Sequence, residues 1–453
     1  MSRRGALDVV VAGGGVVGAA TALMLAREGL QVALVEPKAP APWQREVRDL
    51  RVYAFAPDNA ALFGELGAWA GVLASRVQPY RRMQVWDAAG GDALAFEADT
   101  LGQPQLGWII ENNALVDALW RLLAAAGVRL HCPARIETLQ QDEAGVRVGL
   151  DDGLVLEAKL AIAADGGQSA LRTLAGIGTT RHDYHQQGVV AFVASEQPHR
   201  DTCWQRFLTT GPVALLPFND DGDADVRGRL GSIVWTLPDA DAQRLRDAEP
   251  AQFEEALAGA FGGELGGFRL QSARAAFPLQ RQLAATHLAG RVLLLGDAAH
   301  VVHPLAGQGV NLGLRDVAAL RDHVRAAKSR GGDIASPTRL ARWARGRRSE
   351  NTVNAHAFET INRVYSNDTL LPTLLRGHAL GLAGSCHRFR ARCGGMRRGF
   401  SSVRPVWSLR WRLPSGVRFA ARMPLREPPD GPATAIERNG LELANSVCVR
   451  SSC

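Results

Sequence analysis

Three glycines near the start of the sequence have the spacing of a phosphate-binding turn. Gly13, Gly15 and Gly18 form the pattern GxGxxG between an apolar segment, residues 7–12, and a helix predicted over residues 16–28. In such a turn the first glycine permits a sharp bend, the second lets the backbone approach a pyrophosphate, and the third allows the helix to pack closely on the strand. The N-terminus of the helix would offer unpaired N–H groups and a partial positive charge to the phosphates.

An acidic residue follows at the distance that this type of site requires. Glu36 lies eighteen residues after Gly18, at the end of a second strand predicted over residues 31–36. There its carboxylate can accept hydrogen bonds from the hydroxyls of an adenosine ribose. This βαβ unit predicts dinucleotide binding, and it does not distinguish NAD from FAD.

A second candidate segment is the turn at residues 164–172, Ala-Asp-Gly-Gly-Gln-Ser-Ala-Leu-Arg, which follows a strand predicted over residues 160–164. Two interpretations are open. In the first, the turn brings Asp165 close to a bound cofactor. In the second, the segment is a simple turn in which Ser169 caps a helix.

The most informative segment is residues 296–313. Its Asp297 follows a strand predicted over residues 291–295, and ligands bind at this end of the strands in open parallel sheets. An Asp there can hydrogen-bond the polyol chain that joins the pyrophosphate to the flavin ring.

The rest of this segment fits a planar ring. Pro304 and the turn Gly307-Gln308-Gly309 would let the ring lie close to the backbone. The helix predicted over residues 310–327 would direct its partial positive charge at the N1/O2 edge, where reduced flavin is negative. The three segments together predict FAD held along its whole length, and the candidate cofactor-binding residues of this segment are Asp297, Pro304, Gly307, Gly309 and Asn311.

The apolar periodicity predicts an α/β fold, in which a Rossmann-like FAD-binding domain carries an inserted antiparallel sheet and C-terminal helices. Further helices are predicted at residues 58–69, 114–126 and 340–365, and strands at 146–150, 189–194, 213–218 and 229–235. The expected domains are a discontinuous FAD-binding domain (1–70, 105–182 and 280–330), a substrate-binding sheet domain (71–104 and 183–279), a C-terminal helical region (331–385) and a basic tail (386–453).

Charge is unevenly distributed along the 453 residues. The formal net charge is +7, but residues 386–453 alone hold thirteen Arg and four acidic residues, a net of +9, so the rest of the chain is close to neutral at −2. This balance argues against nucleic-acid binding by the body of the protein. Three interpretations of the tail are open: a disordered basic extension, a change of reading frame near residues 384–385, or a membrane- or partner-docking arm that uses Trp407 and Trp411.

The cysteines and the N-terminal segment indicate the cellular compartment in which the protein is expected. Cys132 and Cys203 are the only cysteines before residue 386, and no pair has the spacing of a metal site. The apolar run near the N-terminus is interrupted by Asp8 and by glycines, which argues against a signal peptide. We expect a cytoplasmic protein without a metal site.

The three segments resemble the group A flavin aromatic monooxygenases, which have the fold of para-hydroxybenzoate hydroxylase, and more narrowly the hydroxylases of ubiquinone biosynthesis. The resemblance spans about residues 7–384 and stops before the tail. Some short segments look most like the branch that hydroxylates demethoxyubiquinol, the 3-methyl-6-methoxy-1,4-benzoquinol intermediate. These segments are residues 79–82, 85–86, 110–112, 202–205 and 211–212.

The resemblance implies further site residues. Arg51 matches an arginine that contacts the flavin region, and Asn112 matches a position near the flavin chain. The residues alone leave an alternative for each: Arg51 is a charge on the protein surface, and Asn112 caps a helix. His303, where the family often has Asn, would alter the pocket above the flavin together with Pro304, whereas His300 is interpreted as structural.

The implied activity is ring hydroxylation of a polyprenylated quinol or phenol, with NAD(P)H as transient electron donor, O2 as co-substrate and a C4a-hydroperoxyflavin as oxidant. No side chain is assigned as the catalytic base. The alternatives are hydroxylation of another ring position in the same pathway, or a flavin- or nucleotide-binding protein without turnover. Peripheral contact with the inner membrane, or with other proteins of ubiquinone biosynthesis, is expected from the substrate type alone.

Overall fold

A largely parallel sheet carries the glycine-rich turn. The computed structural model describes residues 7–90, 93–219, 224–302 and 309–349, all of which belong to one compact unit, Met1–Gly399. The central strands run in the order β19–β11–β1–β2–β8 and are all parallel, with β18, β9 and β10 added antiparallel. The bounds are β1 (Leu7–Ala12), β2 (Val32–Val35), β8 (Arg129–His131), β9 (Ile136–Gln141), β10 (Val146–Leu150), β11 (Val155–Ala163), β18 (Leu288–Ala289) and β19 (Val292–Leu294).

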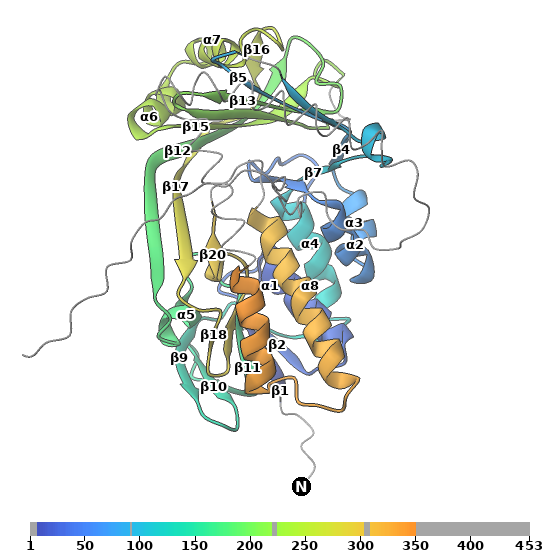
Figure 1. Ribbon diagram of the computed structural model, residues 1–453, viewed down its shortest axis with the longest axis vertical. Helices are drawn as coiled ribbons and strands as arrows, with labels where there is room; N and C mark the ends of the chain where they lie inside the picture. The colour runs from blue at the N-terminus through green and yellow to red at the C-terminus, as the bar shows by residue number, and fades with distance from the viewer. Residues whose placement is uncertain (1–6, 91–92, 220–223, 303–308, 350–453) are drawn as a thin grey trace, which may run out of the picture. The chain divides into compact units, whose positions relative to one another are not determined.

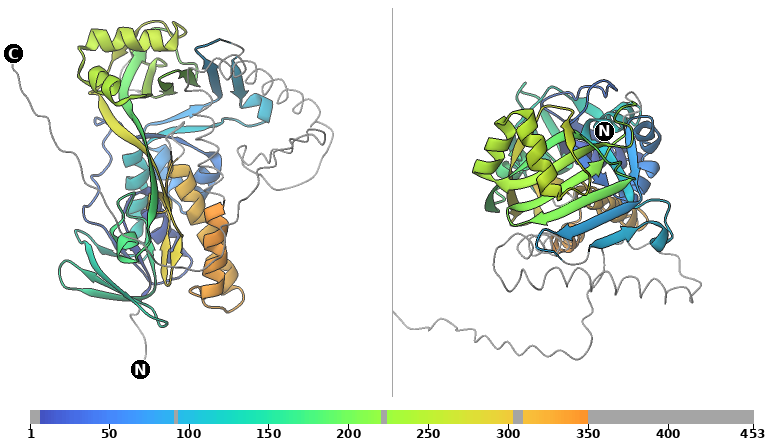
Figure 2. Two further views of the ribbon diagram at one scale, coloured as in Figure 1. Left: turned by 60° about the vertical axis from the view of Figure 1, so that its left-hand side comes forward. Right: turned by 90° about the horizontal axis from the view of Figure 1, so that it is seen from above.

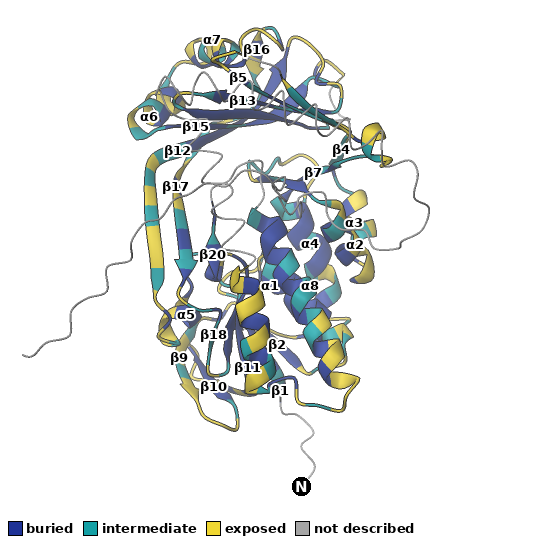
Figure 3. Cartoon of the chain, in the orientation of Figure 1, coloured by how far each residue is buried: buried dark blue, intermediate teal, exposed yellow. Residues whose placement is uncertain are grey.

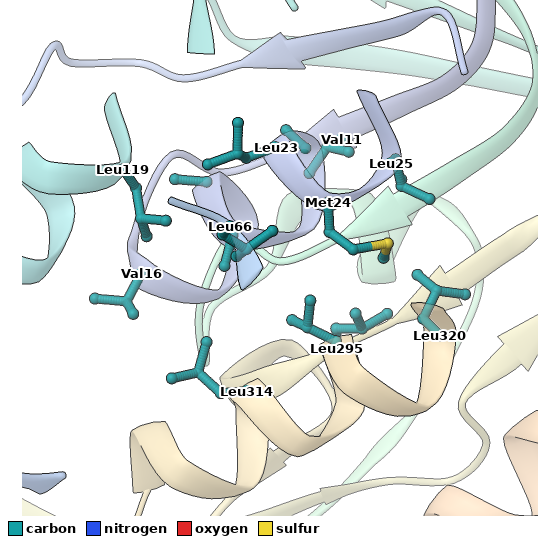
Figure 4. Close-up of a cluster of buried hydrophobic side chains, with 14 of the residues drawn as sticks. Val11, Val16, Leu23, Met24, Leu25, Leu66, Leu119, Leu295, Leu314 and Leu320 are labelled. Carbon is teal, nitrogen blue, oxygen red and sulfur yellow. The ribbon is translucent and has the colours of Figure 1, made fainter. Parts of the chain in front are cut away.

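Three helices cover one face of this sheet: α1 (Val16–Arg27), α4 (Asn112–Leu123) and α8 (Gly309–Lys328) lie side by side (Figure 1). Because side chains alternate along a strand, Val9 and Val11 of β1 pack under these helices, whereas Val10 packs on the opposite face. Figure 4 shows part of the contact between α1 and α8, in which Met24 of α1 points toward α8 and its Leu320. The helices therefore hold the turn at the end of β1 in a rigid frame.

A second, mostly antiparallel sheet lies above the first (Figure 1). Its strands run in the order β20–β17–β12–β15–β14–β13–β5–β6, with β16 beside β12, and helices α6 and α7 cover its outer face (Figure 2, right). The bounds are β5 (Arg82–Asp87), β6 (Leu94–Glu97), β12 (Thr179–Ser195), β13 (Thr202–Leu208), β14 (Gly211–Pro217), β15 (Leu230–Pro238), β16 (Phe268–Leu270), β17 (Ala275–Ala284), β20 (His300–Val301), α6 (Asp239–Asp247) and α7 (Pro250–Phe261).

The strands β12 and β17 join the two sheets as a long antiparallel ribbon. The lower part of β12 is more exposed than its upper part, as the banded colours of Figure 3 show. In the upper part of β12, Val189 and Ala191 face the helices α6 and α7, whereas Val190 faces the cavity between the sheets. The other labelled elements are a small sheet, three helices and two short 3-10 helices. The sheet consists of β3 (Val52–Phe55), β7 (Gly107–Glu111) and β4 (Val77–Tyr80). The helices are α2 (Pro57–Glu65), α3 (Trp69–Leu73) and α5 (Ala170–Leu174), and the 3-10 helices are η1 (Asp99–Leu101) and η2 (Gly296–Ala298).

The expected fold class is confirmed, with two local differences. The helix predicted over residues 58–69 is interrupted: α2 ends at Glu65, and Gly67 adopts a left-handed conformation, φ +64°, before α3 begins. The helix predicted over residues 340–365 is seen from residue 337 to 349, and its remainder, like the tail, lies outside the described residues. The division into domains stays a prediction; within its second segment, β5 and β6 join the upper sheet and β4 pairs with β7.

Candidate functional site

The glycine-rich turn has the geometry that its three glycines require. Gly13 has φ +95°, and a Cβ there would lie 2.4 Å from the carbonyl oxygen of Ala164, so the turn packs directly on the end of β11. A Cβ on Gly18 would lie 1.9 Å from the carbonyl oxygen of Gly13. A Cβ on Gly15, by contrast, would meet no protein atom within 4 Å. The backbone at Gly15 is therefore open to a ligand at the N-terminus of α1.

Glu36 lies beside this turn at the end of β2. Its carboxylate accepts hydrogen bonds from the Gly14 N–H at 2.5 Å and the Lys38 N–H at 3.1 Å. A carboxylate has about four acceptor positions, so Glu36 keeps capacity for ribose hydroxyls. Trp120 of α4 holds the turn from the other side by donating its indole N–H to the Gly14 carbonyl at 2.7 Å. The sequence interpretation missed Trp120, since an indole at helical spacing looks like core.

The turn after β11 caps a helix and also places Asp165 at the cavity, and a contact between Asp165 and the cofactor stays a prediction. Ser169 caps α5 by accepting the Arg172 N–H at 2.9 Å, and Asp165 accepts the Leu171 N–H at 3.1 Å. The other carboxylate oxygen of Asp165 is buried, and within the described chain it has no hydrogen-bond partner. Arg172 donates to the carbonyls of Gly167 and Ala298, at 2.8 and 2.9 Å, and so ties this turn to the Asp297 segment.

Asp297 follows β19, as the sequence predicts, and its side chain is exposed to the cavity between the two sheets. Protein nevertheless surrounds it on most sides, and this desolvation raises the pKa of its carboxyl, while His300 and Arg51 act in the opposite direction. Gly309 and Val310, at the N-terminus of α8, line the same cavity. Their end of the helix carries unpaired N–H groups and a partial positive charge.

Arg51 and Asn112 lie together on the wall opposite Asp165. Both line the cavity, and the Asn112 N–H donates to the Arg51 carbonyl at 2.9 Å. Burial raises the pKa of the Tyr53 phenol, so Tyr53 stays protonated and donates to the Asn112 side chain at 3.3 Å. Asn112 is the first residue of α4, after the capping position at Glu111, so its side chain does not cap the helix.

A buried ion pair, absent from the sequence interpretation, stabilises the loop that carries Arg51. Arg76 and Glu111 are 4% and 0% exposed, and their charged groups are 2.8 Å apart. Glu111 also accepts the Asp49 N–H at 2.8 Å and the Trp43 indole N–H at 3.2 Å. These residues are far apart in sequence and have no motif spacing, so only the structure brings them together.

The side chain of Asn311 is engaged within the protein. It is fully buried, accepts the Ala56 N–H at 3.0 Å and the Asn59 amide at 2.8 Å, and donates to the Ala54 carbonyl at 2.8 Å. A contact between Asn311 and a cofactor would thus be made by its backbone. The candidates His303, Pro304 and Gly307 lie outside the described residues.

Apart from Gly18, which packs against Gly13, the remaining candidates meet at two adjoining cavities. The larger, about 770 Å³, is lined by Gly13, Gly15, Glu36, Arg51, Asn112, Asp165, Asp297 and Gly309. The smaller, about 380 Å³, shares Gly15, Glu36 and Asn112 and continues along residues 38–47. Gly15, Asp165 and Asp297 therefore border one elongated cleft.

The described residues fit FAD. The open backbone at Gly15, the spare acceptor capacity of Glu36 and the unpartnered buried oxygen of Asp165 all face this cleft or border it. A group with a ribose on one side of a pyrophosphate and a chain of hydroxyls on the other would satisfy Glu36, the Gly15 backbone and Asp165 respectively.

Comparison with known proteins gives the same cofactor. Residues 6–348 match the FAD binding domain family. The chain is 36% identical over 377 residues to 3-demethoxyubiquinol 3-hydroxylase of Escherichia coli K12, which covers 83% of this chain and 93% of the relative. It is 34% identical over 376 residues to ubiquinone hydroxylase UbiL of Rhodospirillum rubrum, covering 83% and 85%. It is 33% identical over 419 residues to the human mitochondrial ubiquinone biosynthesis monooxygenase COQ6, covering 82% and 87%.

Solved structures share the fold. The p-nitrophenol 4-monooxygenase PnpA of Pseudomonas putida has a TM-score of 0.65 at 20% identity, covering 87% of this chain and 99% of that one. PqsL of Pseudomonas aeruginosa, a probable FAD-dependent monooxygenase, has a TM-score of 0.63 at 22% identity, covering 83% and 99%. This is the expected fold of the para-hydroxybenzoate hydroxylase type. With a family match over three quarters of its length and a cleft shaped for the cofactor, the chain belongs to the FAD binding domain family and is an FAD-dependent aromatic-ring monooxygenase.

Proposed function

We propose that this monooxygenase hydroxylates the ring of a polyprenylated benzoquinol or phenol in ubiquinone biosynthesis, in a reaction of the demethoxyubiquinol type. The observation that carries the proposal is the composition of the upper wall of the large cavity. The upper wall presents mainly apolar side chains of β12, β15 and β17, namely Val190, Val234, Phe277, Pro278 and Leu279, whereas the ionisable side chains Glu36, Arg51, Asp165 and Asp297 all lie on the lower wall. Phe277 is 45% exposed, and together with its apolar neighbours in this wall it forms a contiguous apolar surface of the kind that marks a ligand-binding groove.

An apolar wall opposite a flavin suits an aromatic ring with an aliphatic tail. The side chains of this wall exclude water from the reacting ring and can orient it by stacking against Phe277. The curated relatives, whose names refer to ubiquinone or demethoxyubiquinol, support this class of substrate. A polyprenyl tail would continue along the apolar wall toward the membrane or a partner protein.

Each candidate residue has a role in holding FAD. The turn from Gly13 to Gly18 would bind the pyrophosphate and Glu36 the ribose, while Asp165 and Asp297 would accept hydrogen bonds from the polyol chain. Arg51 and Asn112 would contact the flavin half from the opposite wall, and the backbone at Gly309 and Asn311 would present its N–H groups to the ring. When bound, FAD supplies the oxygen-transfer chemistry, with NAD(P)H as the electron donor typical of group A enzymes.

Location follows from the substrate. A long prenyl chain partitions into the bilayer, so we place the protein in the cytoplasm with peripheral contact at the inner membrane. Among the described residues, no helix combines the length and the apolar character needed to cross a bilayer.

The purified protein tests the activity. We expect a yellow protein that oxidises NAD(P)H in an O2-dependent reaction, accelerated by a short-chain methoxybenzoquinol and accompanied by a hydroxylated product. NADH and NADPH are compared in the same assay. A flavin-loaded protein that oxidises NAD(P)H without any hydroxylated product from quinol analogues would contradict the substrate class.

The ring position needs a separate experiment. Mass spectrometry of quinones in a strain that lacks the gene identifies the intermediate that accumulates. Accumulated demethoxyubiquinone supports the proposal. Accumulation of a precursor that lacks another ring hydroxyl would assign the alternative, hydroxylation of a different position in the same pathway.

A further inference from the structure

A fully buried carboxylate lies directly beneath the Asp297 segment, and the roles described above do not use it. Asp316 of α8 is 0% exposed, and its two oxygens accept hydrogen bonds from the Gly296–His300 segment and from Arg347. One oxygen accepts the Gly296 N–H at 3.0 Å and His300 Nε2 at 2.7 Å, and the other accepts Arg347 Nε at 2.7 Å.

The charge state of this cluster is well defined. Burial by itself raises the pKa of the Asp316 carboxyl, but His300, Arg347 and the Gly296 N–H outweigh burial and hold that pKa well below its usual range. The carboxylate is therefore ionised and can only accept, so His300 carries its proton on Nε2. Arg347, at 6% exposed, supplies the permanent positive charge that a fully buried carboxylate needs.

Two of the three donors belong to the cofactor segment. Gly296 immediately precedes Asp297, and His300 begins β20, which pairs with β17 of the upper sheet. The Gly296 turn also packs closely on Gly313 of α8. A Cβ on Gly313 would lie 3.1 Å from the Gly296 Cα and 2.6 Å from the side chain of Val17. Asp316 lies one helical turn after Gly313 and thus faces the same turn. Asp316 therefore contacts the backbone just before Asp297 and the side chain of His300 after it.

The third donor comes from a helix that does not touch the cleft. Residues 337–349 form the helix drawn in orange beside α8 in Figure 1, and its Leu340 and Trp343 pack in the same core as α8. None of the described residues of this helix lines either cavity. Arg347 is its contact with the carboxylate that holds the cofactor segment.

We propose that Arg347 is a positioning residue for the cofactor: through Asp316 it fixes the Gly296–His300 segment, so that the C-terminal helix controls how tightly and in which orientation FAD is held. The helix acts at a distance from the cleft through the buried carboxylate of Asp316. Without its cation, this carboxylate would turn toward other donors or bind water. Gly296 and His300, which are hydrogen-bonded to it, would then shift as well.

The test separates positioning from general stability. Full-length Arg347→Met is compared with Arg345→Met, which changes an exposed arginine two residues earlier on the same helix. For each apoprotein, the unfolding temperature is measured first. Flavin fluorescence then gives the Kd for FAD, and visible circular dichroism reports the environment of the bound ring.

We expect Arg347→Met to raise the Kd for FAD at least about tenfold and to change the dichroism of bound flavin, while Arg345→Met changes the Kd less than about twofold. In the double variant Asp316→Asn/Arg347→Met, the Kd should equal that of Asp316→Asn alone, because Arg347 acts only through that carboxylate. If Arg347→Met does not fold, Arg347→Lys, which keeps the charge without the Nε donor, should still raise the Kd measurably.

Several outcomes would overturn the proposal. One is an Arg347→Met apoprotein that unfolds at a lower temperature but binds FAD with wild-type Kd and dichroism, which would make Arg347 purely structural. Another is an additive effect of the two substitutions on the Kd, which would show that Arg347 acts independently of Asp316. The third is a wild-type Kd in Arg347→Lys where the methionine variant does not fold.

Discussion

The two ends of the cleft are built in different ways. At the end near Gly15 and Glu36, most lining residues come from one continuous βαβ unit and the loop that follows it, and three residues of α4, Asn112, Asn113 and Val116, complete the lining. At the other end, Asp297 faces side chains of β12, β15 and β17, which are as many as 107 residues earlier in the chain. Local sequence thus specifies the first end, whereas the second exists only because two sheets pack together.

Both ends nevertheless depend on a buried carboxylate paired with an arginine. Glu111 with Arg76 holds the loop of residues 43–49, whose Gln44 and Val47 line the first end, and Asp316 with Arg347 holds the segment near Asp297. Loops have few apolar contacts of their own, so charged hydrogen bonds in the interior fix their positions. The positions of residues that line a cofactor cleft are therefore fixed in part by residues that do not line it.

The largest expected effect tests the pair at the first end. Arg76→Met leaves the fully buried Glu111 without its cation and should lower the free energy of unfolding by about 3–5 kcal/mol. Arg81→Met, which breaks an ion pair whose side chains are 50% and 80% exposed, should cost about 1 kcal/mol or less. Urea unfolding measures both. Equal decreases in the free energy of unfolding for Arg76→Met and Arg81→Met would mean that losing the buried ion pair costs no more than losing the exposed one.

The next effect concerns pH and the second end. His287 stacks on His300 at 6.1 Å, and burial lowers the pKa of its imidazole from 6.5 to about 4. Between pH 6.5 and pH 4, His287 binds a proton in the unfolded chain but not in the folded chain. As the pH falls through this range, the free energy of unfolding therefore decreases by up to about 3 kcal/mol.

His287→Asn removes this titration, so the variant should lose less stability than the wild type between about pH 7 and about pH 4.5. The exposed His185→Asn is the matched control and should keep the wild-type pH dependence. Urea unfolding at the two pH values gives the comparison. Parallel losses in wild type and His287→Asn would show that His287 does not titrate in this range.

A third change separates cofactor affinity from folding at the first end. A methyl group on Gly15 meets no protein atom within 4 Å, so Gly15→Ala should fold with a wild-type apoprotein unfolding temperature. The same methyl group projects where the pyrophosphate would approach, and the Kd for FAD should rise about 10- to 30-fold. The control is Gly64→Ala, which also meets no protein atom within 4 Å and lies in α2. An unchanged Kd in Gly15→Ala would place the phosphates elsewhere.

The smallest effect tests the upper wall. Phe277→Ala removes an aromatic surface from the cavity and should raise the KM for a quinol analogue about fivefold, a loss of about 1 kcal/mol, without changing the Kd for FAD. Leu154→Ala, at another exposed apolar side chain, should leave both constants unchanged. Steady-state oxidation of NAD(P)H and flavin fluorescence give the two constants. A KM unaffected by Phe277→Ala would move the ring binding site away from this wall.

Local sequence patterns are sufficient to predict the parallel βαβ frame, the glycine turn and the carboxylates at the ends of its strands. Apolar periodicity and glycine positions depend on neighbours only a few residues away, so residues such as Gly13, Glu36 and Asp297 could be identified without a structure. The same local reasoning treated the stretch around Gly67 as one continuous helix, because it could not weigh the left-handed turn there.

Only the tertiary structure decided what lies behind and above the cofactor. It placed the Asn311 side chain against Ala54, Ala56 and Asn59, joined Arg347 to Asp316, and set Phe277 in the wall of the cavity. These contacts join residues whose separation along the chain follows no period. They form because the packing of sheets and helices leaves particular polar groups buried, and each buried charge must then find a partner wherever the fold provides one.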